Sequence, residues 1–575
     1  MAEFDLVVRG GRVADGRGGE PYVADIGIKD GVFTTIGANL TKGEAEIDAA
    51  NRLVTPGFVD IHTHYDGQAT WDSYLAPSSW HGVTTAVMGN CGVGFAPVRP
   101  EDRDRLVEVM EGVEDIPGAA LHEGLAWNWT GFPDYLDALE RRPHDIDIAA
   151  QLPHAALRIF VMGERGARLE MATDDDIAQM RRLAREAMEA GALGFTTSRT
   201  LNHRTKRGDP TPSLRAAEAE LTGILQGLDD ASAGVFEMIS DFDSPGPDAE
   251  FGIVRRLAQR FARPTTLSLA QVHHDPAAWK ILLGLIGAAA DNGLPIKGQV
   301  APRPIGTLLG LQASLNPFSA HPSFRSLAAL PFAEKVAALR QPEFRARLFS
   351  ERPVGRAAEA VARFSDFERI FPLGSPPKYE PAPESSIAAT ARATGRQVLE
   401  IALDLMLEEE GRGFLFAPFS NFADRNLEAC RAMLDSPHTL VGLGDGGAHV
   451  GMISDASFPT FLLSYWGRDR PTGRFDLAHL VRMQTLDTAR AVGLLDRGCI
   501  APGYKADLNV IDFDNLTLQA PIMVDDLPAG GRRLLQRAQG YDATVKSGVV
   551  TYLKGEATGA LPGRLVRGAQ KAPGL

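Results

Sequence analysis

The sequence predicts an α/β protein, namely a (β/α)8 barrel of the TIM type with a small β-sandwich domain built from both termini. Its 575 residues fit one large barrel and one smaller domain better than several small domains. Short apolar segments alternate with helical segments through the middle of the chain, as in a parallel sheet covered by helices. Both ends carry short strands separated by Gly, Asp and Lys.

The two ends have the periodicity of strands. Near the start, the apolar residues Phe4, Leu6 and Val8 alternate with other residues and are followed by a turn at Gly10–Gly11. Near the other end, residues 549–553 form a similar apolar run. The predicted division is 1–56 plus 496–575 for the small β domain, 57–495 for the barrel, and about 305–395 for an insertion in the barrel.

The middle of the chain alternates strands with helices. Residues 174–191 predict a helix, with acidic residues in the first turn and Gly191 at the end. The segment 305–395 is rich in Pro and Phe and lacks this rhythm, so we expect it to lie over one end of the barrel. Strands are expected at 57–61, 84–88, 194–197, 235–239, 266–272, 296–300, 414–417 and 440–443.

Composition excludes some classes of protein. The formal net charge is -14, and binding to nucleic acid requires clustered basic residues. A small anionic substrate is still allowed, because local charge decides its binding. No apolar run reaches the ~18 residues of a membrane span, and the start of the chain lacks the pattern of a signal peptide. The three cysteines do not make a disulfide framework, so we expect a cytoplasmic protein.

The strongest chemical signal is a pair of histidines at the end of a strand. The segment Pro56–His64 reads P-G-F-V-D-I-H-T-H, which is an apolar strand followed by His62 and His64. Residues i and i+2 of a strand lie on the same side, so both imidazoles are able to bind one metal ion. The carboxyl ends of the strands form the functional face of such a barrel. We therefore expect a metal site at this strand end.

A cysteine follows the next apolar strand, in the segment M-G-N-C-G-V-G (residues 88–94). A thiolate binds borderline metals such as zinc, so Cys91 is open to three interpretations: a metal ligand, a nucleophile, or a small buried residue. Its position after the strand that follows the histidine pair favours a ligand or a residue that lines the site.

An aspartate ends a later strand, in the segment L-G-D-G-G-A-H (residues 443–449). Asp445 stands between glycines, which places a carboxylate in an open turn near the barrel mouth. Such a carboxylate is able to contact the metal and to take a proton from an activated water, although Asp-Gly pairs also occur in ordinary turns. His449 is a candidate for orienting the site or the substrate.

Two adjacent histidines follow the predicted strand 266–272. His273 is a candidate ligand if it faces the barrel interior, and His274 then points the other way or binds substrate. A purely structural role for both stays open.

Taken in order, these motifs resemble the N-acyl-D-amino acid deacylase (D-aminoacylase) branch of the amidohydrolase superfamily. The flanks L-V-V-R-G-G-R-V-A-D-G and G-C-I-A-P-G-Y-K-A-D-L-N-V-I-D resemble the split β domain of that superfamily, so the likeness spans nearly the whole chain. The resemblance implies one or two divalent metal ions, usually zinc. It assigns the ligands to His62, His64, Cys91, Asp445 and His273.

The sequence departs from this branch at two points. The strand that usually carries a further histidine has none here, so either Glu237 replaces it as an oxygen ligand or a second metal is absent. Asp275 stands where the branch usually has a lysine that helps to hold the substrate carboxylate. Arg303 and Arg199 are the candidate anion-binding residues in its place, and each is equally compatible with a structural role.

These observations predict a metal-dependent hydrolase that cleaves an amide C–N bond of a small, carboxylate-bearing N-acyl amino acid or dipeptide. Asp445 is expected to act as general base and then as general acid. The alternatives are a cyclic-amide or lactone hydrolase or a deaminase of the same superfamily, and, from another class, a non-catalytic ligand-binding barrel. We expect no nucleic-acid or membrane partner, and assembly into a homo-oligomer is left open.

Overall fold

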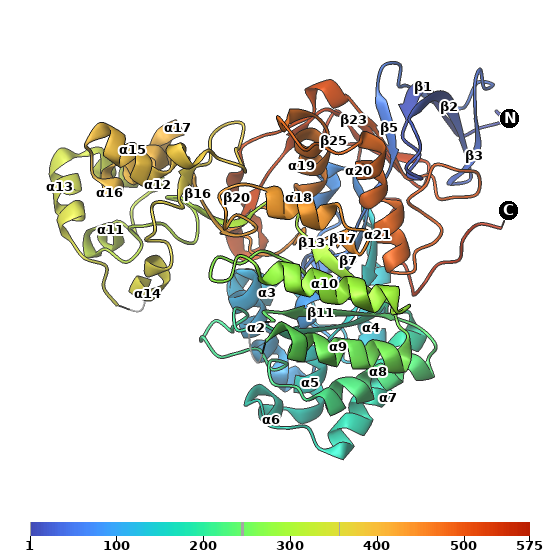
Figure 1. Ribbon diagram of the computed structural model, residues 1–575, viewed down its shortest axis with the longest axis horizontal. Helices are drawn as coiled ribbons and strands as arrows, with labels where there is room; N and C mark the ends of the chain where they lie inside the picture. Colours follow the sequence, from blue (N-terminus) through green and yellow to red (C-terminus); the bar gives the residue numbers. More distant parts are fainter. Residues whose placement is uncertain (1, 243–245, 356, 575) are drawn as a thin grey trace.

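Figure 1 shows a computed structural model of the protein, which describes residues 2–242, 246–355 and 357–574. Residues 1, 356 and 575, which belong to the predicted terminal domain and insertion, lie outside the described residues. Three regions are visible: a barrel with its helices, a helical lobe at the left, and a β domain beside both termini. No helix of the described residues is long and apolar enough to cross a membrane.

The described residues form a parallel barrel of eight strands, in which β8 and β9 count as one strand interrupted at Gln151. The ring closes where Thr63, just beyond β6, bridges to Gly446, beyond β17. All six residues of β7 are buried, which explains its continuous apolar character. The strands are β6 (Phe58–Asp60), β7 (Val83–Met88), β8 (Asp147–Ala150), β9 (Leu152–Pro153), β10 (Gly194–Arg199), β11 (Val235–Ser240), β12 (Thr265–Ser268), β13 (Ile296–Val300) and β17 (Thr439–Val441).

Helices cover the outside of the barrel (Figure 1). The predicted helix at 174–191 is α7, which begins after a Thr173 capping box and ends at Gly191 with φ 107°. The main helices around the barrel are α2 (Arg103–Glu114), α4 (Phe132–Glu140), α5 (His154–Met162), α7 (Asp174–Ala190), α8 (Glu218–Asp230), α9 (Pro247–Phe261), α10 (Ala278–Asp291), α18 (Glu428–Leu434), α20 (Leu477–Met483) and α21 (Leu486–Ala491).

Residues 305–420 form a helical lobe that projects from the barrel and has its own apolar core, and this lobe extends past the predicted insertion at about 305–395 (Figure 1). The segment 414–417, expected as a barrel strand, belongs instead to β16 (Leu415–Ser420). This strand pairs antiparallel with β14 (Ile305–Leu309) and β15 (Phe371–Pro372), because the lobe supplies its partners. The lobe helices are α11 (Pro322–Ser326), α12 (Phe332–Arg340), α13 (Pro342–Ser350), α14 (Ala357–Ala362), α15 (Ile387–Thr394), α16 (Val398–Met406) and α17 (Glu408–Gly411).

The two ends of the chain share one sheet. Its order is β25-β24-β23-β18-β5-β1-β2-β3, with β4 paired to β1. The antiparallel pairing of β5 with β18 joins the N-terminal strands to the C-terminal ones. The strands are β1 (Leu6–Val13), β2 (Tyr22–Lys29), β3 (Val32–Gly37), β4 (Ala45–Asp48), β5 (Leu53–Pro56), β18 (Leu508–Ile511), β23 (Tyr541–Lys546), β24 (Val549–Leu553) and β25 (Glu556–Ala557).

Candidate metal centre

The histidine pair and Asp445 are joined through their backbones. His62 and His64 follow β6 and are each 1% exposed. The N–H of His64 donates to the carbonyl of Gly446 over 2.7 Å, and the N–H of Asp445 donates to the carbonyl of His62 over 3.0 Å. A Cβ on Gly446 would lie only 2.4 Å from Oγ of Ser78, so a glycine is required at this close approach. The Gly-Asp-Gly turn therefore brings the carboxylate beside the imidazoles.

Cys91 stands in a tight turn directly after β7. Its φ of 55° lies in the left-handed region, which is unfavourable for a residue with a Cβ. The turn is held by Asp66, whose carboxylate accepts the N–H of Gly89 over 3.1 Å. A Cβ on Gly92 would lie 2.9 Å from Cα of Thr197 on β10, so the turn packs closely on the neighbouring strand. This strained backbone directs the thiol into the barrel mouth.

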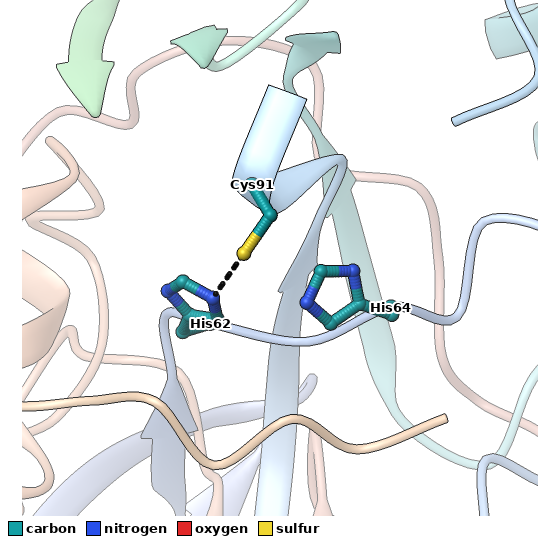
Figure 2. A group of neighbouring side chains, drawn as sticks. All are labelled: His62, His64 and Cys91. Atoms are coloured by element: carbon teal, nitrogen blue, oxygen red, sulfur yellow. Dashed lines mark hydrogen bonds between the residues drawn. The ribbon is translucent and has the colours of Figure 1, made fainter. Parts of the chain in front are cut away.

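The side chains of His62, His64 and Cys91 converge (Figure 2). The ligand atoms of His62, His64 and Cys91 all lie within 4.8 Å of one another, and all three residues are buried. Sγ of Cys91 lies 3.3 Å from Nε2 of His62. Oδ1 of Asp445 lies 3.4 Å from Nε2 of His62 and 3.5 Å from Nε2 of His64. This Oδ1 is buried and has no hydrogen-bond partner, which fits an atom that faces a cation. Two imidazoles, a thiolate and a carboxylate form a donor set suited to zinc.

Two buried glutamates lie behind the histidines. Oε1 of Glu237, on β11, is 3.2 Å from Nδ1 of His62, and Oε1 of Glu114, at the end of α2, is 3.2 Å from Nδ1 of His64. Gln299 on β13 also contacts Nδ1 of His62, with Oε1 at 3.0 Å. Glu114 was not expected from the sequence, because a single acid at the end of a helix carries no motif. Only the fold brings it to the site.

The charges of these groups depend on one another. Burial alone would lower the pKa of His62, but the carboxylates of Glu237 and Asp445 outweigh it and raise the pKa to about 9. Burial would raise the pKa of Asp445, but the facing His64 and His62 rings hold it well below its ordinary value. Burial and the nearby carboxylates raise the pKa of the Cys91 thiol. The site is thus rich in acidic groups, and a cation would favour ionised Cys91.

Two further histidines face the site. Burial, together with the charges of His449 and His64, lowers the pKa of His203 to about 3. Nδ1 of His203 is 2.8 Å from Oγ of Ser198, at the end of β10. The side chain of His449 is 21% exposed, and its Nε2 lies 3.7 Å from Oε2 of Glu114. His203 was missed in the sequence because it stands in a loop, five residues after Ser198, without a recognisable pattern.

His273 and His274 are not brought to this group. The strand β12 ends at Ser268, earlier than expected, and Val272 then bridges to Ser420 of the lobe sheet. The ring of His273 is half-buried; burial and the nearby Arg369 lower its pKa. His274 is exposed. Because the chain leaves the barrel before His273, this residue is not part of the buried group of His62, His64 and Cys91.

The two candidate anion-binding arginines have internal partners. Arg303 is 1% exposed, and its guanidinium pairs with Asp455 at 3.1 Å and lies 3.5 Å from the ring centre of Tyr379. Arg199 pairs with Glu250 and donates to the carbonyl of Ala216 over 2.6 Å. Both guanidinium groups are therefore committed to the fold in this structure.

Comparisons with known proteins identify the family of this chain. A family model described as "Amidohydrolase family" matches residues 45–552. A D-aminoacylase from Alcaligenes xylosoxydans xylosoxydans is 26% identical over 573 residues, covering 98% of this chain and 97% of the relative. An uncharacterized protein of Mycobacterium tuberculosis (strain ATCC 25618 / H37Rv) is 35% identical over 204 residues, which are 34% of this chain and 32% of that protein.

A solved structure has the same fold. It is N-acyl-D-glutamate deacylase from Bordetella bronchiseptica, complexed with zinc and a phosphonate inhibitor that mimics the tetrahedral intermediate of its reaction. It superposes with a TM-score of 0.64 at 22% identity and covers 98% of this chain and 99% of its own. The barrel with a β-sandwich from both termini is thus the fold of this chain.

Proposed function

Because this chain belongs to the amidohydrolase family, we propose that it hydrolyses an amide C–N bond in a small N-acyl amino acid or a similar dipeptide-like substrate. The observation that carries this proposal is the convergence of two imidazoles, a thiol and a carboxylate in one buried site at the barrel mouth. The full-length similarity to D-aminoacylase supports the substrate class.

We propose that the site holds one zinc ion through Nε2 of His62, Nε2 of His64, Sγ of Cys91 and Oδ1 of Asp445. Imidazole, thiolate and carboxylate are the donor types that zinc prefers, and a catalytic site of this kind also needs an open position for water. His273, which lies outside the group, is not included. When bound, a zinc ion lowers the pKa of water and polarises a carbonyl group.

Asp445 is the proposed proton carrier. Its carboxylate stays ionised at neutral pH, because the histidines hold its pKa low. Its side chain is 14% exposed, whereas those of both histidines are 1% exposed, so Asp445 is the more accessible group. It would accept a proton from the attacking water and return it to the leaving nitrogen as the C–N bond breaks. Both transfers use one carboxylate, so no second acid is required.

The substrate is proposed to meet His449 and His203 rather than the two arginines. His449 is partly exposed beside Glu114 of the site, and its charge acts on His203. Arg303 and Arg199 would have to break buried ion pairs before they could bind a substrate carboxylate.

A substrate panel tests this proposal. Zinc-loaded protein is incubated with N-acetyl-D- and N-acetyl-L-amino acids and dipeptides, and release of the free amine is measured beside the metal content of the same sample. We expect hydrolysis that depends on zinc. Turnover confined to hydantoins or lactones, or release of ammonia from an amino-substituted ring, would contradict amide deacylation. A metal-free protein that stays inactive after zinc addition would contradict the hydrolase assignment itself.

A further inference from the structure

The two histidines of the metal centre have the same arrangement. Each ring turns Nε2 towards Asp445, at 3.4 Å from His62 and 3.5 Å from His64. Each ring turns Nδ1 towards a buried glutamate at 3.2 Å, which is Glu237 for His62 and Glu114 for His64. Nδ1 of His62 also hydrogen-bonds Oε1 of Gln299 at 3.0 Å. The glutamates come from different elements, β11 and α2, so the repetition is not a consequence of one local motif.

The glutamates lack the partners that buried acids usually have. Both are 1% exposed. Both carboxylate oxygens of Glu114 and Oε1 of Glu237 are buried without a hydrogen-bond partner of normal geometry. Among the described residues, no lysine or arginine forms an ion pair with either acid. A buried carboxylate without such a partner is costly, and the facing imidazoles are able to offset part of that cost by donating from Nδ1.

We propose that Glu114 and Glu237 are positioning residues that fix the orientation and tautomer of His64 and His62, and that neither is a metal ligand. An imidazole that donates its Nδ1–H to a carboxylate keeps the lone pair of Nε2 free for the metal, and the carboxylate makes that nitrogen more basic. The inference rests on the metal site of the proposed function. It assigns the ligand atoms of both histidines to Nε2.

Glu237 serves a second donor as well. Its Oε2 accepts the backbone N–H of Cys91 over 3.3 Å, while its Oε1 faces His62. One carboxylate therefore orients both the thiol turn and an imidazole. Glu114 in turn lies 3.7 Å from His449 through its other oxygen. Loss of Glu237 should consequently weaken the metal site more than loss of Glu114.

The zinc affinities of three glutamine variants test the proposed positioning role of Glu114 and Glu237. In the Glu114→Gln and Glu237→Gln proteins, we expect zinc affinity, measured by competition with a chelating dye, to fall by about 10- to 100-fold. Glu220→Gln is the matched control. Glu220 is equally buried and bonds His154 over 2.8 Å, but it lies outside the metal group. Its variant should keep wild-type zinc affinity, whatever its stability.

Cobalt spectra separate positioning from ligation. In cobalt-loaded Glu237→Gln, the ligand-field and thiolate charge-transfer bands should keep their wild-type positions at saturation, because the ligands are unchanged. Bands that shift would show that Glu237 is a ligand and would overturn the proposal for it. Wild-type zinc affinity in both variants, with stability reduced as in Glu220→Gln, would show a structural role only.

The tautomers of the two rings are measured on the wild-type protein. Long-range proton–nitrogen NMR of zinc-loaded protein with labelled histidine should show two rings protonated at Nδ1, with metal-bound Nε2. His62→Ala and His64→Ala spectra assign these signals. Rings bound to zinc through Nδ1 would overturn the proposal. Metal affinity and tautomer are read without turnover, so an inactive wild type would contradict the proposed function alone.

Discussion

Two buried charged clusters lie at opposite ends of the barrel. They differ in whether each charged group has a hydrogen-bond or ion-pair partner within the protein. The mouth cluster follows the carboxyl ends of the strands, whereas the floor cluster lies at the start of β8, against the terminal β domain. The mouth cluster consists of His62, His64, Cys91, Glu114, Glu237 and Asp445. The floor cluster consists of Asp147, Arg497, Lys505, Asp507 and Lys546.

In the floor cluster, each charge has a partner of opposite sign. Asp147 pairs with Arg497 at 2.8 Å and with Lys505 and Lys546 at 3.0 Å. Lys546 also binds Asp507 at 2.8 Å. Among the described residues, no side-chain atom of this cluster is buried without a hydrogen bond. Such a network joins the two domains and leaves no place for a ligand.

In the mouth cluster, acidic groups exceed the cations that face them. Oδ1 of Asp445, Oε1 of Glu237 and both oxygens of Glu114 are buried without a hydrogen bond. The two largely buried clusters thus differ in whether groups of the protein pair with every charge. Unsatisfied buried acids beside histidines and a thiol therefore indicate a metal centre, whereas a fully paired cluster indicates a structural joint.

Asp445→Asn should have the largest effect. The amide cannot carry a proton, so kcat should fall by about 100- to 10,000-fold, the usual contribution of a general base. Zinc content should stay near that of the wild type, because the amide oxygen remains a donor. Steady-state kinetics and metal analysis on one sample measure both. Activity within a few-fold of the wild type would remove Asp445 from the mechanism.

Lys546→Met should lower the stability of the protein and leave its activity and zinc binding unchanged. Removing one partner of a buried ion pair leaves uncompensated charge, so the free energy of unfolding should fall by about 3–5 kcal/mol. Zinc affinity and kcat of the folded protein should not change, because the floor cluster lies at the other end of the barrel. Denaturant unfolding and chelator competition test this. A loss of zinc affinity would show that the two clusters are coupled.

The smallest effect concerns pH. Burial would raise the pKa of Asp147 above 3.8, but Lys546, Arg497 and Lys505 outweigh it and lower the pKa. A lowered pKa gives stability that is present above the unfolded-state pKa and is lost as pH falls towards the folded-state value. Wild-type stability should therefore decrease as pH falls below about 4, and Lys546→Met should show a shallower decrease. Equal slopes in denaturant titrations at several pH values would contradict this.

The sequence predicted the parts of the site that depend on local patterns. His62, His64, Cys91 and Asp445 each follow a short apolar strand, and the barrel brings such strand ends together. Glu114 escaped prediction because it comes from a helix that reaches the site only through tertiary packing.

The sequence was less informative where a strand length or a pairing partner decides the outcome. His273 was expected near the site because the apolar run 266–272 reads as one strand, but β12 ends at Ser268. The run 414–417 has the composition of a barrel strand, yet the lobe provides its antiparallel neighbours. The amino-acid composition shows which segments are apolar. The length of a strand and the strands it pairs with depend on contacts between residues that are distant in the sequence.

X-ray absorption of the zinc-loaded protein tests the proposed zinc site. We expect about one zinc per chain, with one sulfur at about 2.3 Å and nitrogen and oxygen atoms at about 2.0–2.2 Å, as zinc sites of this type show. Loss of the sulfur signal in Cys91→Ser would identify its source. A wild-type spectrum without sulfur, or with a second metal at close distance, would contradict the four-donor site.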